Sequence, residues 1–239
     1  MVAPLPPIPI FIGYDPRLRA AVNVLIDSLV QHSSRPLAIT PIVARQMGPA
    51  LWRPRGQDES TEFSISRFLV PYLMGYQGWA LFMDGDMLAR DDINELWDLR
   101  DDRHAVMVVQ HDHRPSSPLK FGGARQSAYP RKNWSSLILF NCARCQALTP
   151  AYVNTASGLA LHGFEWLAGE EEAIGALPGK RWNHLVDVQP EPQCQADRGG
   201  PALLHWTLGG PWFRDSRTAG GPLAAEWFAA RDGAFRLWE

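Results

Sequence analysis

The first 43 residues carry the pattern that most constrains the fold. Residues 8–12 form a short apolar run that ends in a Gly-Tyr-Asp-Pro turn. Residues 19–30 place apolar side chains at helical spacing, and residues 37–43 form a second apolar run. A strand, a helix and a strand in this order make a βαβ unit, whose two strands are parallel. We therefore expect an α/β fold, a Rossmann-like domain with a central, mostly parallel sheet flanked by helices.

The rest of the chain continues this alternation. Helical spacing predicts helices over residues 62–74, 91–99 and 222–230, and a helix in two pieces over residues 158–175. Pro71 is expected to kink the first of these or end it early. Apolar runs predict further strands over residues 79–83, 105–109 and 137–140. No repeat, low-complexity tract or linker divides the chain, so we expect one domain over residues 1–239.

The composition limits the classes of function. With 46% hydrophobic residues, a chain of 239 residues can bury a full core without disulfides or structural metals. A net charge of −2 argues against bulk nucleic-acid binding, which requires a basic face. The basic residues are nearly all arginine, with only three lysines: Lys120, Lys132 and Lys180. Arginine suits bidentate contacts with phosphate, but a GC-rich genome would produce the same bias.

We expect neither a targeting segment nor a membrane-spanning segment in this sequence. Residues 1–7 lack a basic region and are interrupted by prolines, so they do not read as a signal peptide. No run approaches 18 apolar residues. We expect a cytoplasmic, bacterial-type enzyme, with peripheral contact at the inner membrane left open.

Three cysteines are too few for a disulfide framework. Cys142 and Cys145 have the spacing of a redox or zinc pair. However, a zinc site needs four ligands, and neither a second cysteine pair nor a nearby histidine supplies the other two. We expect both to be packing residues.

Asp84-Gly85-Asp86 directly follows the apolar run 79–83, and it is the strongest candidate for a functional site. In an extended segment, residues two apart point to the same side, so the two carboxylates repel unless a cation or water lies between them. Gly85 removes side-chain bulk and would let a ligand approach the backbone. The carboxyl end of a parallel strand is where such folds bind ligands, and carboxylate oxygens suit Mg²⁺ or Mn²⁺. An ordinary surface turn is the alternative interpretation.

An EF-hand calcium loop also places acids in this pattern. Asp84, Asp86, Asp92 and Glu95 fit positions 1, 3, 9 and 12 of such a loop. Position 6 requires glycine for a sharp turn but is Ala89 here, and the preceding segment reads as a strand. We therefore reject the calcium loop.

Taken in order, these segments resemble the glycogenin-like retaining glycosyltransferases of family eight. The resemblance runs from about residue 8 to residue 213. It rests on a nucleotide loop after the first strand, an arginine on a helix, the strand with Asp-x-Asp, a Glu-Leu-Trp helix, an acceptor-side strand, an acidic cluster and a histidine before Pro-Trp. These elements correspond to residues 11–15, 64–73, 79–86, 93–97, 137–141, 170–174 and 204–212.

The resemblance implies a GT-A fold, a nucleoside-diphosphate sugar donor and a divalent metal. It divides the chain into a nucleotide-binding half at residues 8–110 and an acceptor-side half with a C-terminal tail at residues 111–239. It implies Mn²⁺ or Mg²⁺ at Asp84, Asp86 and His205, although a histidine after an apolar pair is commonly a core residue. The implied donor-binding residues are Gly13, Tyr14, Asp15, Arg67, Gly85, Ser135, Gly209 and Gly210. Tyr14 as a packing residue and Arg67 as a surface helix charge are the alternatives.

Catalysis by a carboxylate points to the acidic cluster at residues 170–172. Glu170 and Glu171 are the implied catalytic residues with Arg67, and Glu171 aligns with the family position that faces the reacting carbon. An inverting enzyme needs a carboxylate to deprotonate the acceptor, whereas a retaining enzyme does not. The alternative is that these acids only stabilise the start of a helix. Retention follows from the resemblance, and the residues alone leave the stereochemistry open.

Two positions depart from the family pattern. The Asn-x-Gly before the acceptor-side strand is replaced by residues 134–136, with Asn133 one place early. The lysine expected near the diphosphate is absent from residues 209–211, and Arg214, Arg217 or the glycine amides would have to replace it. A separate, related GT-A family therefore stays open.

The expected activity is transfer of a sugar, from a UDP-sugar in the first instance, to a glycan, lipopolysaccharide-type or small acceptor. A sugar nucleotidyltransferase would need a glycine-rich basic loop, and only Arg17 and Arg19 follow Gly13. A non-catalytic carbohydrate- or partner-binding module would keep the fold and lose the metal. The long segment at residues 110–134 and the tryptophan-rich tail are the expected acceptor region.

Overall fold

The computed structural model describes residues 5–56, 59–112, 130–167, 169–178, 181–186, 188–189 and 200–236. Its strands are β1 (Ile8–Tyr14), β2 (Leu37–Val43), β3 (Trp79–Met83), β4 (Met87–Ala89), β5 (Val106–Val108), β6 (Leu137–Asn141), β7 (Ile174–Ala176), β8 (His184–Leu185) and β9 (Leu203–His205). Its helices are α1 (Arg19–His32), α2 (Val70–Leu73), α3 (Ile93–Trp97), α4 (Pro150–Thr155), α5 (Gly158–His162) and α6 (Pro222–Ala234). Short 3-10 turns join several of them.

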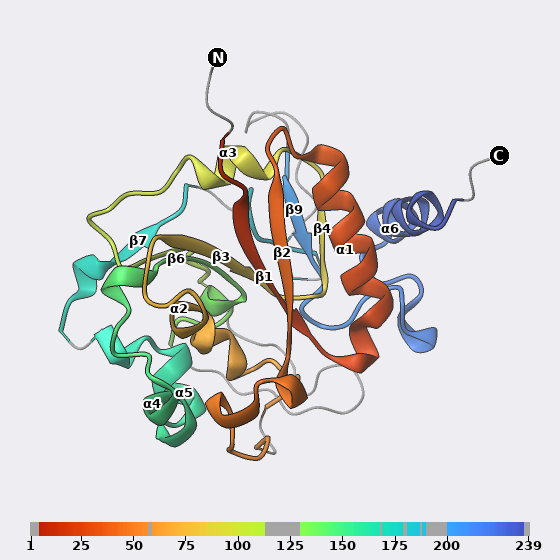
Figure 1. Cartoon of the computed structure of the whole chain (residues 1–239). Coiled ribbons are helices and arrows are strands. Elements are labelled where there is room, and N and C mark those ends of the chain that lie inside the picture. The colour runs from red at the N-terminus through yellow and green to blue at the C-terminus, as the bar shows by residue number, and fades with distance from the viewer. Residues whose placement is uncertain are drawn as a thin grey trace.

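The N-terminal βαβ unit forms as predicted. β1 pairs in parallel with β2 and with β3. One face of α1 is buried by Ala21, Val22, Leu25 and Leu29. β2 is an edge strand with a largely exposed face, which explains why it tolerates Pro41. Figure 1 shows β1 and β2 side by side, with α1 packed alongside them.

The main sheet has the order β2-β1-β3-β6-β5-β7, and it is mixed. β6 is antiparallel to both of its neighbours, whereas the other pairs in this sheet are parallel. The α/β prediction is confirmed, with one reversed strand at the centre. The apolar run of β6 could not reveal this, because a strand buried on both faces reads the same in either direction.

A second sheet, of order β4-β9-β8, was not predicted. Its strands have only two or three residues, which is too short for a recognisable period. β4 leaves the Asp-Gly-Asp segment and lies against α1, where Ser28 Oγ accepts a hydrogen bond from the amide of Ala89. α6 packs on the same helix, beside it in Figure 1.

The predicted helix over residues 62–74 is mostly wrong. Only a 3-10 turn at Ser66–Leu69 and the four-residue α2 form, and Pro71 lies in the first turn of α2. A proline there needs no amide partner. The end of the predicted helix over residues 158–175 is also wrong, because Ile174 begins β7 beside β5. α4 was not predicted. No helix within the described ranges is both long and apolar enough to cross a bilayer.

Candidate metal centre

The Asp84-Gly85-Asp86 segment is a tight link between β3 and β4, and backbone hydrogen bonds fix both of its ends. The amide of Asp84 donates to the carbonyl of Ser136 at 2.9 Å. The carbonyl of Asp86 accepts from the amide of Trp206 at 3.0 Å. The two carboxylates are therefore held between the start of β6 and the end of β9.

Gly85 is required for packing within the protein. A Cβ at this position would lie 2.5 Å from the carbonyl oxygen of Gly13 and 2.6 Å from Cγ2 of Val22. The sequence had suggested that the missing side chain makes room for a ligand, but the atoms that approach are those of β1 and α1. A contact between Gly85 and a ligand stays a prediction. This packing places the predicted nucleotide loop, which begins at Gly13, against the Asp84-Gly85-Asp86 segment.

His205 joins the two aspartates through the second sheet. β9 runs antiparallel to β4, with Met87 opposite His205. His205 Nε2 lies 3.3 Å from Asp86 Oδ1 and 4.0 Å from Asp84 Oδ2. One ligand atom from each residue lies within 4.8 Å of the others. The structure thus brings together the three residues predicted to hold a metal.

Arg67 forms a buried ion pair with one of these carboxylates. Its Nη1 lies 2.7 Å from Asp84 Oδ1, and the same nitrogen donates to the carbonyl of Ser135 at 2.8 Å. Its guanidinium carbon lies 5.3 Å from the ring centre of Phe63 and 5.0 Å from that of Phe82. Arg67 is only 5% exposed, so the alternative of a surface helix charge is wrong. Asp84 therefore turns one oxygen to Arg67 and the other to His205.

The donor set fits a divalent cation. Asp86 is 5% exposed and His205 is 1% exposed, so solvent screens neither of them well. Two carboxylates and one guanidinium leave one formal negative charge, and two acidic oxygens face the ring nitrogen of His205. Carboxylate oxygens with one imidazole suit Mg²⁺ or Mn²⁺, and a bound cation would relieve the repulsion. Asp84, Asp86 and His205 can thus hold such an ion.

Asn183 and Ser136 lie behind His205, and no sequence motif gave either of them a role. Asn183 Oδ1 lies 2.9 Å from His205 Nδ1, and Asn183 Nδ2 donates to Ser136 Oγ at 2.8 Å. Asn183 is fully buried just before β8. No motif marked this asparagine, because its partner is 22 residues away on a strand that was also missed.

The predicted nucleotide loop after β1 contains an aspartate that is already fully engaged. Asp15 Oδ1 accepts from the amide and Nε of Arg17, while Oδ2 accepts from Arg17 Nη2 and the amide of Glu62. Burial by itself raises the pKa of Asp15, but these hydrogen bonds outweigh it and hold the pKa below its usual value. Tyr14 is half-buried against the core. Contacts of Gly13, Tyr14 and Asp15 with a base or ribose stay predictions.

Ser135 lies behind the ion pair of Arg67 and Asp84. Its hydroxyl lies 2.6 Å from Nδ1 of His162, which meets the ring of Phe68 edge-on. Asn133 precedes it in the left-handed region at φ 65°, which asparagine tolerates better than most residues. Asn133 is 8% exposed and lies next to the predicted donor-binding residue Ser135.

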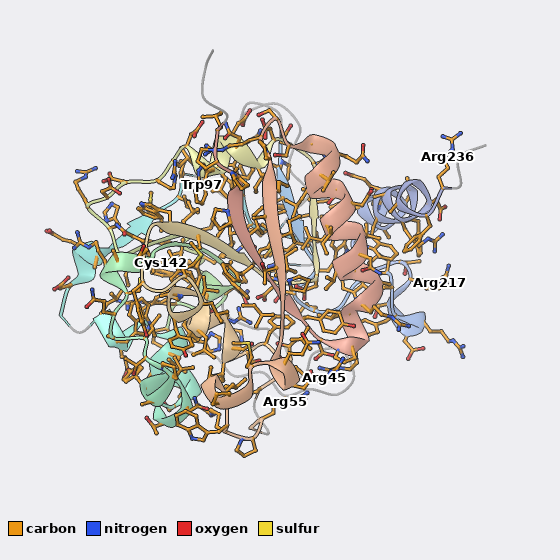
Figure 2. The ribbon with its side chains drawn as sticks, in the orientation of Figure 1. Arg45, Arg55, Trp97, Cys142, Arg217 and Arg236 are labelled. Carbon is orange, nitrogen blue, oxygen red and sulfur yellow. The ribbon has the colours of Figure 1, made fainter. Side chains whose placement is uncertain are left out.

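The glycine pair after β9 is buried under tryptophan. Gly209 has φ +107°, and a Cβ at Gly210 would collide with the ring of Trp212. Arg214 and Arg217, offered as substitutes for the missing lysine, are exposed. Arg217 lies 5.0 Å from the ring of Phe228 on α6, at the outer edge of the molecule (Figure 2). Roles for Gly209 and Gly210 in binding stay predictions.

The acidic cluster lies before β7. Glu170 and Glu172 are exposed, and the carbonyl of Glu172 is bonded to His104 Nδ1. The side chain of Glu171 and most of the 110–134 segment lie outside the described residues.

Cys142 and Cys145 are buried, as expected for packing residues. Their thiols donate to backbone carbonyls, and burial raises the pKa of Cys142 to about 12. Figure 2 shows Cys142 inside the molecule.

Solved structures of glycosyltransferases share this fold. The galactosyltransferase LgtC, solved with donor and acceptor sugar analogues, matches with a TM-score of 0.59 and 13% identity over 97% of this chain and 98% of its own. The bifunctional glycosyltransferase WbbM matches with a TM-score of 0.56 and 13% identity over 94% of this chain. This chain spans 51% of WbbM, about half of its length. These matches confirm the GT-A fold and the resemblance in structure to the family-eight enzymes.

The sequence itself has a much nearer relative. No family model matches the chain. Protein CDI of Arabidopsis thaliana is 48% identical over 215 residues, which cover 87% of this chain and 80% of that protein. Identity at this level and over this length leads to one conclusion: the chain belongs to the family of Protein CDI, and its fold is the GT-A fold of glycosyltransferases.

Proposed function

We propose that this protein is a metal-dependent glycosyltransferase that acts in the cytoplasm. It moves a sugar from a nucleoside-diphosphate donor, with UDP-sugars favoured, to a glycan, lipopolysaccharide-type or small acceptor. The observation that carries this proposal is the convergence of Asp84, Asp86 and His205 at the carboxyl end of β3, on a GT-A fold. Because Protein CDI is a plant protein, the acceptor need not be a bacterial glycan.

The reaction needs charge stabilisation on the leaving diphosphate. Asp84, Asp86 and His205 would hold a Mn²⁺ or Mg²⁺ ion, which when bound would supply a Lewis acid for that group. Arg67 neutralises one of the two carboxylates, so the site changes from one formal negative charge to one positive charge when a divalent ion is added. That sign favours a diphosphate anion. Arg67 also holds Asp84 so that Oδ2, rather than Oδ1, faces His205.

The surrounding loops would position the donor. In this proposal Gly13, Tyr14 and Asp15 line the base and ribose, while Ser135, Gly209 and Gly210 lie along the sugar and diphosphate. The contact of Gly85 with Gly13 supports the first part, because it brings the nucleotide loop beside the metal ligands. We assign retention of configuration, with Glu171 toward the reacting carbon and Glu170 beside it, on the resemblance to the retaining family.

A thermal-shift panel with UDP-, GDP- and CMP-sugars, each with and without Mn²⁺, tests the proposal. We expect stabilisation by one nucleotide class that depends on Mn²⁺, followed by slow Mn²⁺-dependent release of the free nucleoside diphosphate. Binding without release would favour the non-catalytic module. No Mn²⁺-dependent shift with any sugar nucleotide would overturn the proposal.

A further inference from the structure

We infer that a buried hydrogen-bond chain from the carbonyl of Asn133 through Ser136 and Asn183 sets the tautomer of His205 and thereby its metal affinity. Asn183 and Ser136 are positioning residues in this inference. The part that concerns metal affinity rests on the proposed metal site. The claim about the tautomer depends only on hydrogen bonds between residues of this chain.

The direction of each hydrogen bond follows from its first acceptor. The carbonyl of Asn133 can only accept, so Ser136 Oγ must be the donor across the 2.6 Å between them. Having spent its single hydrogen, Ser136 Oγ must accept from Asn183, which it does from Nδ2 at 2.8 Å. Asn183 Oδ1 then faces His205 Nδ1 at 2.9 Å. This orientation of the amide is the one that satisfies both contacts.

The last acceptor in the chain decides the state of the imidazole. Asn183 Oδ1 has no hydrogen, so His205 Nδ1 must carry one. A neutral ring with a proton on Nδ1 has its lone pair on Nε2. That atom faces Asp84 Oδ2 and Asp86 Oδ1, at 4.0 Å and 3.3 Å. The chain thus presents to the metal site the nitrogen that can coordinate a cation.

Burial makes this arrangement hard to reverse. Asn183 is 0% exposed, His205 is 1% exposed and Ser136 is 3% exposed. In such surroundings an unpaired donor or acceptor is costly, and a flipped amide or the opposite tautomer would leave unpaired atoms that no solvent can satisfy. The network therefore has one low-energy pattern of donors.

The same turn also holds Asp84, one of the proposed metal ligands. The carbonyl of Ser136 accepts from the amide of Asp84 at 2.9 Å, and the carbonyl of Ser135 accepts from Arg67 Nη1 at 2.8 Å. Arg67 in turn orients the carboxylate of Asp84. One turn before β6 thereby positions the aspartate directly and the histidine through Asn183.

Nitrogen-15 NMR of the imidazole rings in the metal-free protein, at a pH where His205 is neutral, tests the tautomer. We expect the Nδ1–H form for His205 in the wild type. Asn183→Ala should give a mixture with the Nε2–H form. Asn183→Asp should restore the Nδ1–H form, because one carboxylate oxygen can still accept from Nδ1. The other oxygen can accept from Ser136 Oγ only if this hydroxyl turns its single hydrogen away from the carbonyl of Asn133.

Titration with Mn²⁺ alone tests the consequence for binding. Asn183→Ala should weaken Mn²⁺ binding about 10- to 100-fold, the range found for residues behind metal ligands. Ser136→Ala should weaken Mn²⁺ binding less than Asn183→Ala does. Asn183→Asp should bind Mn²⁺ within a few-fold of the wild type. Folding of each variant is followed by thermal unfolding.

A matched control is Asn154→Ala. Asn154 is also a buried asparagine, which accepts from the amides of Trp52 and Arg53 and donates to the carbonyls of Ala50 and Pro150. Its loss should lower stability without changing Mn²⁺ affinity or the state of His205. An effect on Mn²⁺ affinity equal to that of Asn183→Ala would show a general response to destabilisation and overturn the inference.

The remaining outcomes separate this inference from the proposed function. A wild-type His205 in the Nε2–H form, or a tautomer unchanged in Asn183→Ala, overturns the inference and leaves the glycosyltransferase proposal standing. Absence of Mn²⁺ binding by the wild type overturns the proposed metal function and the claim on affinity together. The NMR result then still decides the tautomer.

Discussion

Two aspartates follow two neighbouring parallel strands, and each is paired with an arginine, yet they are built differently. Asp15 after β1 pairs with Arg17, two residues away, and both of its oxygens accept hydrogen bonds from Arg17 and Glu62. Asp84 after β3 pairs with Arg67 through one oxygen and turns the other toward His205. The carboxylate of Asp15 accepts four hydrogen bonds from its own neighbourhood, whereas that of Asp84 pairs with Arg67 through Oδ1 and faces the imidazole of His205 with Oδ2.

This difference separates a carboxylate that is bonded within the loop after β1 from one that lies in the group we propose to hold a metal. Arg17 also donates to the carbonyl of Ser60, so the Asp15 cluster ties β1 to the segment that leads to Arg67. Asp84 instead lies beside Asp86 and His205, and one ligand atom from each of these three residues lies within 4.8 Å of the others. Four predictions follow the contrast between the two aspartates, in decreasing order of expected effect.

Replacing Arg67 by methionine should cost about 3 kcal/mol of unfolding free energy, because it removes the buried guanidinium that pairs with the largely shielded carboxylate of Asp84. Mn²⁺ should recover part of this loss by supplying the missing positive charge. Urea unfolding with and without Mn²⁺ measures both effects. The control is Arg103→Met, whose pair with Asp101 is exposed and should contribute almost nothing. Equal losses in the two variants would contradict the prediction.

Replacing Asp15 by asparagine should lower stability by about 2 kcal/mol, since an amide cannot accept all four hydrogen bonds. Mn²⁺ affinity should stay within twofold of the wild type, at about 0.4 kcal/mol or less. Asp101→Asn is the control, because Asp101 also pairs with an arginine two residues later but lies at the surface. A large loss of Mn²⁺ affinity in Asp15→Asn would place Asp15 in the metal site instead.

Replacing Asp86 by asparagine should reverse that pattern. Folding should be nearly unchanged, while binding of UDP in the presence of Mn²⁺ should fall at least tenfold, about 1.4 kcal/mol. Asp86 is preferable to Asp84 for this test because removing Asp84 would also leave Arg67 unpaired. Calorimetric titration that shows unchanged affinity would refute the metal site.

The smallest expected effect is on acid stability. The pKa of Asp15 is lowered in the folded protein. The contribution of Asp15 to folding stability is therefore complete above its unfolded-state pKa of about 3.9, and it is lost as pH falls through its pKa in the folded protein. Asp15→Asn should therefore flatten the stability curve below about pH 4. Denaturation curves between pH 2 and pH 6 check this, and a parallel shift at every pH would show that titration is not the cause.

The local parts of the fold could be predicted from the sequence. The unit β1-α1-β2 and the strand before Asp84 have clear periods and turn signals, and both form where expected. The direction of β6 and the three short strands of the second sheet depend on long-range pairing, which leaves little trace in so few residues.

The candidate site divides in the same way. Asp84 and Asp86 stand out because they come directly after an apolar strand, and His205 was predicted from the order of the motifs. Asn183 could not be found, because its importance comes from contacts across β8, β9 and the turn before β6. A ligand-binding role for Asp15 stays a prediction, and the hydrogen bonds that its carboxylate accepts from Arg17 and Glu62 could not be read from the sequence.

The close contacts at Gly13 and Gly85 have a consequence for how this family can vary. A side chain at position 85 would strike the carbonyl of Gly13, and one at position 13 would strike the ring of Phe63. The ring of Phe63 also packs against the guanidinium of Arg67. A smaller residue at position 63 would therefore loosen the arginine that pairs with Asp84. Substitutions at Gly13, Phe63 and Gly85 should therefore be tolerated only in combination. A family member that differs at one of these positions should carry compensating changes at the others.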